Sequence, residues 1–209
     1  MILYEGVKRV LDIVLSLILL VILSPVFTLT FVSIFFYDFC PPLYSQKRVG
    51  RYRHEFTFYK FRSMVKNADK ILFANKELYN QMRSGTNKVA NDPRITPIGR
   101  FIRKFSIDEL PQIFNVLKGD MSLVGPRALR PDELSKYEME HPKSKLLIDQ
   151  ILSVSPGITG YWQVSGRSRI SFDKRMEMEA EYSNKKSILF DLLIISKTPL
   201  AVLRAEGAY

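Results

Sequence analysis

The feature that most constrains this chain is an uncharged apolar run near its start. From Ile13 to Tyr37 there is no charged residue and no Asn, Gln or His. A run of this length exceeds what the core helix of a soluble protein needs and suits the hydrocarbon region of a bilayer. It is also longer than the apolar part of a signal peptide, and no small-residue cleavage site follows it. The sequence therefore predicts a membrane helix and anchor at 1–40 and one globular body at 41–209.

Two paths through the bilayer remain open for this segment. Ser24-Pro25 lies at its middle, where proline forces a kink and serine can help to satisfy the freed carbonyl groups. Lys8 and Arg9 precede the apolar run, and four more cations follow it: Lys47, Arg48, Arg51 and Arg53. Positive flanks belong on the cytoplasmic side. The matching flanks favour a re-entrant helix broken at Ser24-Pro25, and a kinked spanning helix is the alternative.

Charge and cysteine usage narrow the classes of function. The net charge is +10, which favours phosphate-rich partners such as nucleic acid, anionic lipid or nucleotide sugars. Cys40 is the only cysteine, so no intramolecular disulfide can form and the body can sit in the cytoplasm. There is no Cys/His metal spacing, Gly-rich nucleotide loop or nucleophile-elbow serine. Dehydrogenase, kinase and hydrolase functions therefore lose support.

Local patterns predict the first elements of the body. Residues 44–62 are typical of a β-hairpin, with Lys60 and Arg62 on one face of its second strand. That face is either a solvated edge or a phosphate-binding surface, which makes both cations candidate substrate contacts. Residues 68–82 predict an amphipathic helix, and a surface loop follows at 84–87.

A short helix with a cationic face is predicted next. It begins at Thr96-Pro97, because threonine is a favourable N-cap and proline suits the first turn. The spacing of three and four residues places three cations on one face: Arg100, Arg103 and Lys104. Three apolar residues can point inward: Phe101, Ile102 and Phe105. The helix therefore presents a cationic ridge.

An acidic pair follows this ridge. Ser106 and Glu109 have the spacing of a capping box for a second helix that ends at Gly119. Capping does not explain Asp108, which the positive end of a helix would keep ionised. An ionised aspartate could attack phosphorus while the neighbouring cations hold a diphosphate and a divalent metal offsets the anionic repulsion. The structural and the catalytic interpretation both remain open on these residues alone.

Two further segments are candidates for phosphate or sugar contacts. Residues 119–127 (GDMSLVGPR) place Arg127 on a tight Gly-Pro turn, a rigid mount for a bidentate phosphate contact. Residues 157–168 combine loop glycines with Trp162 and Arg167. Each segment could equally be a surface turn, and Trp162 could belong to the core.

The last apolar segment, 188–203, is interrupted by Asp191, Lys197 and Pro199. These interruptions make it too broken to span a bilayer. It is either a helix that lies at the membrane interface or a helix packed on the core.

Taken in order, these motifs resemble the bacterial sugar transferase family, the monotopic phosphoglycosyl transferases. The likeness covers nearly the whole chain. It rests on these segments: Lys8-Arg9, Ser24-Pro25, 60–64 (KFRSM), 106–112 (SIDELPQ), 119–127 (GDMSLVGPR), 156–160 (PGITG) and 206–209 (EGAY).

The resemblance implies a fold, an activity and a location. The fold is α+β, mainly helical with a small β-hairpin, and is anchored by a re-entrant helix. The activity is transfer of a sugar-1-phosphate from a UDP-sugar to polyprenyl (undecaprenyl) phosphate at the cytoplasmic face of the bacterial inner membrane, the first membrane step of polysaccharide or glycoconjugate assembly. Membrane phospholipid is a further expected partner, nucleic acid is not, and a homodimer is left open. The chain looks like the minimal form, without an extra N-terminal membrane domain.

The resemblance also implies roles for single residues. Asp108 corresponds to the nucleophile, which carries a covalent phosphosugar and ligates Mg²⁺, and Glu109 corresponds to its partner. The phosphate-binding arginines correspond to Arg103, Arg127 and Arg167. Residues 162–167 (WQVSGR) resemble hexose-1-phosphate members and lean toward UDP-glucose or UDP-galactose.

Two departures from the family pattern stand out. The usual Pro-Arg-Pro is here Pro126-Arg127-Ala128, which bears on the rigidity of the turn. The hairpin turn at 51–54 (RYRH) lacks the usual glycine and affects only a surface loop.

Two rival functions make different predictions. A membrane-tethered basic module that binds nucleic acid or anionic lipid would lose affinity steeply with salt and would tolerate loss of Asp108. An enzyme that transfers the phosphosugar directly, with Glu109 activating the lipid phosphate, would show sequential rather than ping-pong kinetics.

Overall fold

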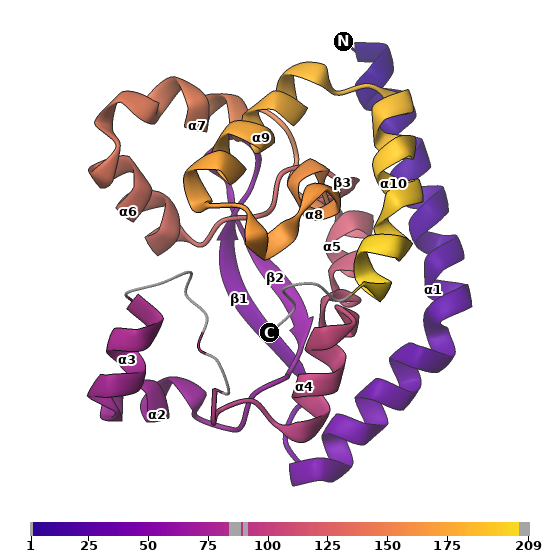
Figure 1. The fold of residues 1–209 in the computed structure, drawn as a ribbon. Helices are drawn as coiled ribbons and strands as arrows, with labels where there is room; N and C mark the ends of the chain where they lie inside the picture. Colours follow the sequence, from indigo (N-terminus) through magenta and orange to yellow (C-terminus); the bar gives the residue numbers. More distant parts are fainter. Residues whose placement is uncertain (1, 84–88, 90–91, 205–209) are drawn as a thin grey trace.

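The computed structural model describes residues 2–83, 89 and 92–204. The predicted loop at 84–87 and the closing motif at 206–209 lie outside the described residues. Helices surround two small two-stranded sheets, and α1 runs along one side of the body (Figure 1). The prediction of a mainly helical α+β fold with a small hairpin is confirmed.

The elements have the following bounds. The strands are β1 (Leu43–Val49), β2 (Glu55–Phe61), β3 (Ser122–Val124) and β4 (Gly157–Thr159). The α-helices are α1 (Ile2–Asp38), α2 (Ala68–Ala74), α3 (Lys76–Arg83), α4 (Pro97–Lys104), α5 (Gln112–Lys118), α6 (Pro131–Glu140), α7 (Lys145–Ile151), α8 (Tyr161–Ser165), α9 (Phe172–Lys185) and α10 (Ile188–Leu203). The 3₁₀ helices are η1 (Arg51–Arg53), η2 (Ile107–Glu109), η3 (Pro142–Ser144) and η4 (Arg167–Arg169).

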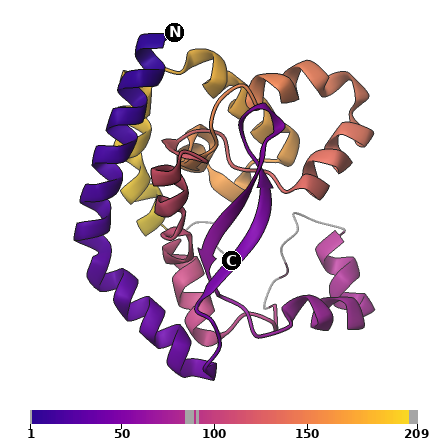
Figure 2. The same ribbon diagram turned by 180° about the vertical axis from the view of Figure 1, so that it is seen from behind.

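Helix α1 bends in its middle but is not interrupted (Figures 1 and 2). Pro25 has no N–H to donate to the carbonyl of Val21, four residues earlier. The hydroxyl of Ser24 donates to that carbonyl instead, at 2.8 Å. The predicted break at Ser24-Pro25 is therefore a bend, because the serine replaces the missing hydrogen bond and lets the helix continue.

Both ends of α1 are fastened to the body by charged side chains. Near its start, Lys8 pairs with Asp191 of α10 at 2.8 Å. Arg9 donates to the carbonyl oxygens of Val116 and Leu117 at the end of α5, at 2.6 and 2.8 Å. At its C-terminal end, Asp38 pairs with Arg62, which directly follows β2.

The two halves of α1 also pack on the body through apolar side chains. Leu15 and Leu19 of the first half lie against the main core around β2, β3 and α5. In the second half, the rings of Phe27 and Phe61 lie 4.7 Å apart. Even so, only 11% of the most apolar 18-residue stretch of α1 is buried inside the protein. By length and composition, the helix could cross a membrane. Its outward face therefore needs an apolar environment outside the protein.

The predicted hairpin is confirmed. Strands β1 and β2 pair antiparallel, from Leu43 opposite Phe61 to Val49 opposite Glu55. Phe56 and Phe58 of β2 alternate into the core, as the period of two residues requires.

The second sheet is a finding that the sequence-based reading missed. Strands β3 and β4 pair in parallel, in two segments for which the sequence predicts only turns or loops. Gly125 and Gly157 make the close approach at the end of this pair. A Cβ on Gly125 would lie 2.3 Å from the carbonyl oxygen of Ser155, so only glycine allows it. The segment that carries Arg127 is thereby fixed to the core rather than lying on the surface.

Three local predictions around the helices need correction or confirmation. The helix predicted at 68–82 is divided into α2 and α3 at Asn75, whose extended backbone ends α2 and whose Oδ1 accepts from Leu78 N at 3.0 Å.

Thr96 is the N-cap of α4, as predicted, and accepts from Gly99 N at 2.8 Å. Phe101 does not point inward, since it is 58% exposed while Ile102 is buried.

The capping box predicted at Ser106 does not form. Ser106 has a positive φ of 55° and makes no capping contact. The acidic residues lie in the single turn η2, and α5 begins only at Gln112. The reason is Pro111, which cannot donate to the carbonyl of Ile107, so the N–H of Leu110 bonds there in 3₁₀ geometry. The end at Gly119, with a φ of 94°, is confirmed.

Helix α10 lies beside α1 (Figure 1). Ile194 is fully buried, whereas an apolar row faces away from the body: Leu189, Leu192, Leu193, Leu200 and Leu203. The helix therefore combines the two expectations for this segment, because one side packs on the core and the other is available to lipid.

Asn115 joins α5 to the hairpin and so fixes the segment that follows η2. Its side chain donates to Thr57 O at 2.7 Å and accepts from Tyr59 N at 3.1 Å, and the residue is fully buried. Asn115→Ala would leave these two backbone groups without partners and should lower the free energy of unfolding by about 2 to 4 kcal/mol. Denaturant unfolding in detergent would measure it. The control Asn75→Ala, at an exposed cap, should cost only about 1 kcal/mol; equal losses would contradict this role for Asn115.

Candidate functional site

The acidic pair lies on η2, the single turn between α4 and α5. The ammonium group of Lys60, on β2, is 2.9 Å from Glu109 Oε1 and 3.4 Å from Asp108 Oδ2. Arg127 approaches from the other side, with its Nη2 3.0 Å from the same Glu109 oxygen. Two cations therefore hold Glu109, and one of them also contacts Asp108.

Burial and charge act differently on the two carboxyl groups. Burial raises the pKa of Asp108, an effect that the positive charge of Lys60 only partly offsets and that the charge of Glu109 increases. Burial also acts against the charge of Glu109, but Arg127 and Lys60 together lower its pKa well below the ordinary value. Glu109 is thus the firmly ionised member, and Asp108 holds its charge at a cost.

One oxygen of Asp108 is available for chemistry. Within the described part of the chain, its Oδ1 accepts no hydrogen bond, and the side chain is 10% exposed. A carboxyl oxygen that has no hydrogen-bond partner and lies next to cations can, when the group is ionised, act as a nucleophile toward an anionic phosphorus centre.

The turn that carries Arg127 is held by side chains from two other elements. The N–H of Arg127 donates to Glu179 Oε1 of α9 at 2.9 Å. The next carbonyl, that of Ala128, accepts from Arg48 Nη1 of β1 at 3.0 Å. The alanine at the position of the usual second proline therefore does not leave the turn unsupported.

Two more predicted arginines act on the pair through their charge. The positive charge of Arg103, at the end of α4, lowers the pKa of Asp108. Arg167, on η4, lies close enough to Glu109 and Arg127 for both charges to affect its own pKa, which burial lowers. The structure therefore brings Lys60, Arg103, Arg127 and Arg167 together around the carboxyl groups, from four separate parts of the chain.

Arg62 is the predicted site residue that the structure places elsewhere. Strand β2 ends at Phe61, so the alternation that placed Arg62 on the same face as Lys60 does not extend to it. Its guanidinium group pairs with Asp38 and donates to Pro41 O at 2.8 Å. It fastens the end of α1 to the hairpin.

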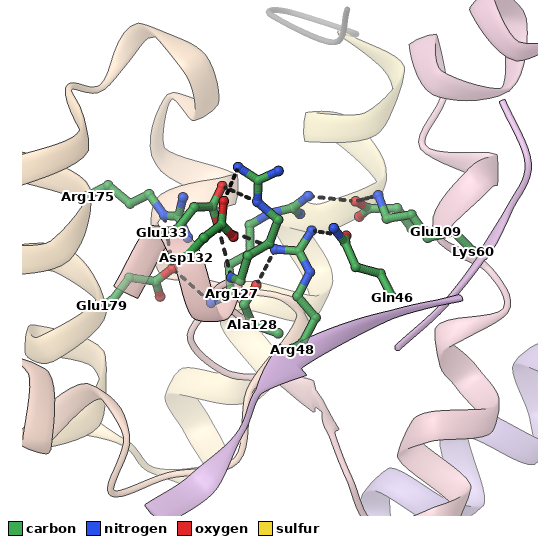
Figure 3. A network of polar contacts seen from close by, with 11 residues as sticks. Gln46, Arg48, Lys60, Glu109, Arg127, Ala128, Asp132, Glu133, Arg175 and Glu179 are labelled. Atoms are coloured by element: carbon green, nitrogen blue, oxygen red, sulfur yellow. Dashed lines mark hydrogen bonds and ion pairs between the residues drawn. The ribbon is translucent and has the colours of Figure 1, made fainter. Parts of the chain in front are cut away.

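Figure 3 shows a polar network behind Arg127 that sequence reasoning missed. Its members labelled in the figure come from β1, α6 and α9: Gln46, Arg48, Asp132, Glu133, Arg175 and Glu179. Arg130, the residue before α6, pairs with Asp132 and Glu133. Burial raises the pKa of Glu179 to about 7, while Arg175 and Arg127 act in the opposite direction. The spacing of Arg175 and Glu179 on one helix was the only available signal, and it is equally typical of an exposed surface pair.

Trp162 lies beside this network. The guanidinium carbon of Arg175 is 4.8 Å from the centre of the Trp162 ring, in cation–π geometry. The indole is half-buried, so Trp162 is not a fully buried core residue. Its contact with a sugar stays a prediction.

The donor set for a metal is small. In the described ranges, no group of three or more His, Cys, Asp or Glu side chains converges on one point. Mg²⁺, however, is commonly held by one or two carboxylates together with the phosphates of a substrate. Asp108 and Glu109 fit that arrangement, because two carboxylates could bind Mg²⁺ together with substrate phosphates. They are too few to bind a metal ion by themselves.

Comparison with known proteins identifies the family. The model of the bacterial sugar transferase family matches residues 3–205. The chain belongs to this family.

Three relatives illustrate the range of bacterial sugar transferases that it resembles. An undecaprenyl-phosphate galactose phosphotransferase of Salmonella typhimurium is 44% identical over 205 residues, or 97% of this chain and 41% of the relative. The exopolysaccharide production protein ExoY of Sinorhizobium fredii is 37% identical over 97% of this chain and 88% of its own. A UDP-N-acetylgalactosamine-undecaprenyl-phosphate N-acetylgalactosaminephosphotransferase of Aeromonas hydrophila is 36% identical over 98% of this chain and 45% of its own. The chain thus spans about two fifths of the first relative and most of the second.

The opposite pKa shifts predict opposite effects on stability. Asp108→Asn should leave the protein at least as stable at pH 7.5, because it removes a charge that burial disfavours. Glu109→Gln should cost about 1.5 to 3 kcal/mol, because Lys60 and Arg127 lose a charged partner. Thermal unfolding in detergent at pH 7.5 and 4.5 would measure both.

The pH dependence follows from the signs of the shifts. A raised folded-state pKa means that ionised Asp108 costs stability at neutral pH, and the cost disappears as pH falls toward the unfolded value of about 3.9. A lowered pKa means that Glu109 stabilises above its unfolded value of about 4.3, and that this is lost as pH falls. Both differences from wild type should shrink at pH 4.5. A destabilised Asp108→Asn beside an unaffected Glu109→Gln would contradict the assignment.

Proposed function

We propose that this chain transfers a sugar-1-phosphate, most simply a hexose-1-phosphate, from a UDP-sugar to undecaprenyl phosphate. The observation that carries the proposal is the geometry of the pair: an Asp108 oxygen without a partner in the described part of the chain, next to an ionised Glu109, inside a ring of cations. The names of the relatives support it, since two of them are sugar phosphotransferases that act on undecaprenyl phosphate. The transfer would begin the assembly of a polysaccharide or glycoconjugate on its lipid carrier.

The reaction proceeds in two displacements at phosphorus. Asp108 Oδ1 attacks the phosphorus that carries the sugar, the bond from that phosphorus to the bridging oxygen breaks, and UMP leaves with that oxygen. An oxygen of undecaprenyl phosphate then attacks the same phosphorus, and its bond to Asp108 breaks. The product is the undecaprenyl diphosphate sugar, and Asp108 is again a free carboxylate.

The surrounding cations counter the charge of the reacting groups. Arg127, which pairs with Glu109, and Arg103, whose charge acts on Asp108, would hold the diphosphate oxygens together with Arg167, whose charge interacts with those of Glu109 and Arg127. Lys60 keeps Glu109 ionised and in place, where its carboxylate would help to hold Mg²⁺ beside the incoming lipid phosphate.

Magnesium is part of this proposal. The Asp108 and Glu109 carboxylates, together with the substrate diphosphate, form a donor set of the kind Mg²⁺ prefers. When bound, the ion would neutralise phosphate charge. Lys60 is close to both carboxylates and would share that task.

We further propose that α1 is re-entrant and that the body lies on the cytoplasmic face of the membrane. Both ends of α1 form ion pairs with the same body, Lys8 with Asp191 and Asp38 with Arg62. A spanning helix would separate these ends across the bilayer, and one of the two ion pairs could not form against a body on one side. The positive flanks support the cytoplasmic side, and the outward leucines of α10 suit an interfacial position.

The covalent step gives a direct chemical test. Enzyme quenched with UDP-sugar and Mg²⁺ in the absence of lipid acceptor should carry an adduct of sugar-phosphate mass on the peptide with Asp108, and UMP should be released. Peptide mass spectrometry detects both. Asp108→Asn should keep the fold and abolish adduct and turnover, whereas Glu109→Gln should retain some adduct formation. Absence of the adduct under conditions where the full reaction runs, together with sequential kinetics, would establish direct transfer instead.

The path of α1 can be tested by cysteine accessibility in intact cells. In a variant without Cys40, single cysteines near Glu5 and near Ser45 should both resist a membrane-impermeant thiol reagent until the cells are opened. A membrane protein that carries a cysteine in a loop known to face the cell exterior serves as the positive control. Labelling of one of the two positions from outside would establish a spanning helix.

A further inference from the structure

The position of Arg127 depends on contacts that neither its own side chain nor its turn provides. Gly125 and Pro126 fix the chain before it, but the residue after it is alanine, which does not lock its own backbone. Within the described part of the chain, the Ala128 N–H donates no hydrogen bond. The backbone on the C-terminal side of Arg127 is therefore held by its neighbours rather than by its sequence.

Two charged side chains supply that support, one on each side of the residue. Glu179 accepts the N–H of Arg127 at 2.9 Å, and Arg48 donates to the carbonyl of Ala128 at 3.0 Å. They come from α9 and β1, which lie on different sides of the turn (Figure 3). The peptide unit directly before Arg127 and the one directly after Ala128 are thus held from two directions.

Both Glu179 and Arg48 are buried ionisable groups, which makes a purely packing role costly. Glu179 is 1% exposed, and its Oε2 has no hydrogen-bond partner in the described part of the chain. Its charge is offset by Arg175, at 3.7 Å, which in turn stacks on Trp162 and Phe172. A neutral side chain would fill the same space without the cost of burying an ionised carboxylate.

The second group is supported in the same way. Arg48 is held by Gln46 at 3.1 Å and by Glu133 at 3.5 Å, while burial lowers its pKa to about 10. Glu179 and Arg48 therefore each have partners of their own that fix the orientation of the side chain. Neither forms a hydrogen bond or ion pair with Asp108 or Glu109, although the charge of Glu109 does act on Arg48. Glu179 therefore gives the cleaner test of an effect that passes through Arg127.

We propose that Glu179 and Arg48 are positioning residues that clamp the backbone on both sides of Arg127 and thereby hold its guanidinium group against Glu109 and the substrate phosphate. This inference rests on the proposed function, since it needs Arg127 to contact the diphosphate. It assigns no contact with substrate to either clamp residue.

A double-mutant cycle on catalytic efficiency separates positioning from general stabilisation. Glu179→Leu should lower kcat/KM by about ten- to hundredfold, the size of one lost contact to a charged group. In an Arg127→Ala background the same change should have an effect of less than about twofold, because the group that it positions is gone. A residue that only stabilises the fold would produce the same loss in both backgrounds.

Conservative and matched changes complete the test. Glu179→Gln keeps an acceptor for the Arg127 N–H and should retain most of the activity. The control Glu177→Leu, on the exposed side of the same helix, should be close to wild type. Ala128→Pro removes no hydrogen bond described here and locks the backbone at 128. It should restore part of the activity lost in Glu179→Leu.

Should Glu179→Leu not fold, Arg48→Met enters the same cycle, with the same non-additivity expected. Equal losses with and without Arg127 for the clamp variants that fold would overturn the proposal. Its failure is distinct from that of the proposed function: in the former case the wild-type enzyme still transfers phosphosugar and Arg127→Ala is impaired, whereas in the latter the wild type forms neither adduct nor product.

Discussion

The structure depends on the double ion pair at Glu109. This single carboxylate receives Lys60 from the hairpin and Arg127 from the turn after β3, and so ties three distant segments to one point. The neighbouring Asp108 is affected by the same cations, because the charge of Lys60 partly offsets the cost of burying its carboxylate. Only its Oδ2 accepts a hydrogen bond from Lys60. Two adjacent residues thereby have different roles: the ion pairs of Glu109 stabilise the site, whereas the buried Asp108 costs stability and is the candidate nucleophile.

What the sequence predicts well here is determined by neighbouring residues. Thr96 as an N-cap, Gly119 as a helix end and the alternation of Phe56 and Phe58 in β2 all follow from local geometry, and all three are found. The capping box at Ser106 failed for a local reason too, since Pro111 directly follows the first turn it would have started and cannot donate to the carbonyl of Ile107. That failure removed the structural explanation of the acidic pair and strengthened the catalytic one.

The missed parts depend on contacts between remote segments. The pairing of β3 with β4 brings together short strands more than thirty positions apart, each too brief for a periodic signal. Glu179 and Arg48 look like ordinary helix and strand surface charges until the fold buries them beside Arg127. Arg62 shows the reverse error, because strand alternation placed it beside Lys60 whereas the strand ends one residue earlier. Local patterns indicated Arg103 and Arg127, and the resemblance to a family assigned them to phosphate binding, but neither could predict the remote residues that hold Arg127 in place.

The ion pair between Lys8 and Asp191 joins the first helix to the last across 183 positions of sequence. Because α1 is synthesised long before α10, Lys8 has no ion-pair partner until the last helix is made, whereas Arg9 finds its partners on α5 earlier. The buried hydroxyl of Tyr182, 2.7 Å from the same aspartate, belongs to this late contact as well. Closure of the body onto its own anchor is therefore an event at the end of synthesis, and a chain that stops before Asp191 would leave an inserted helix with no partner for Lys8.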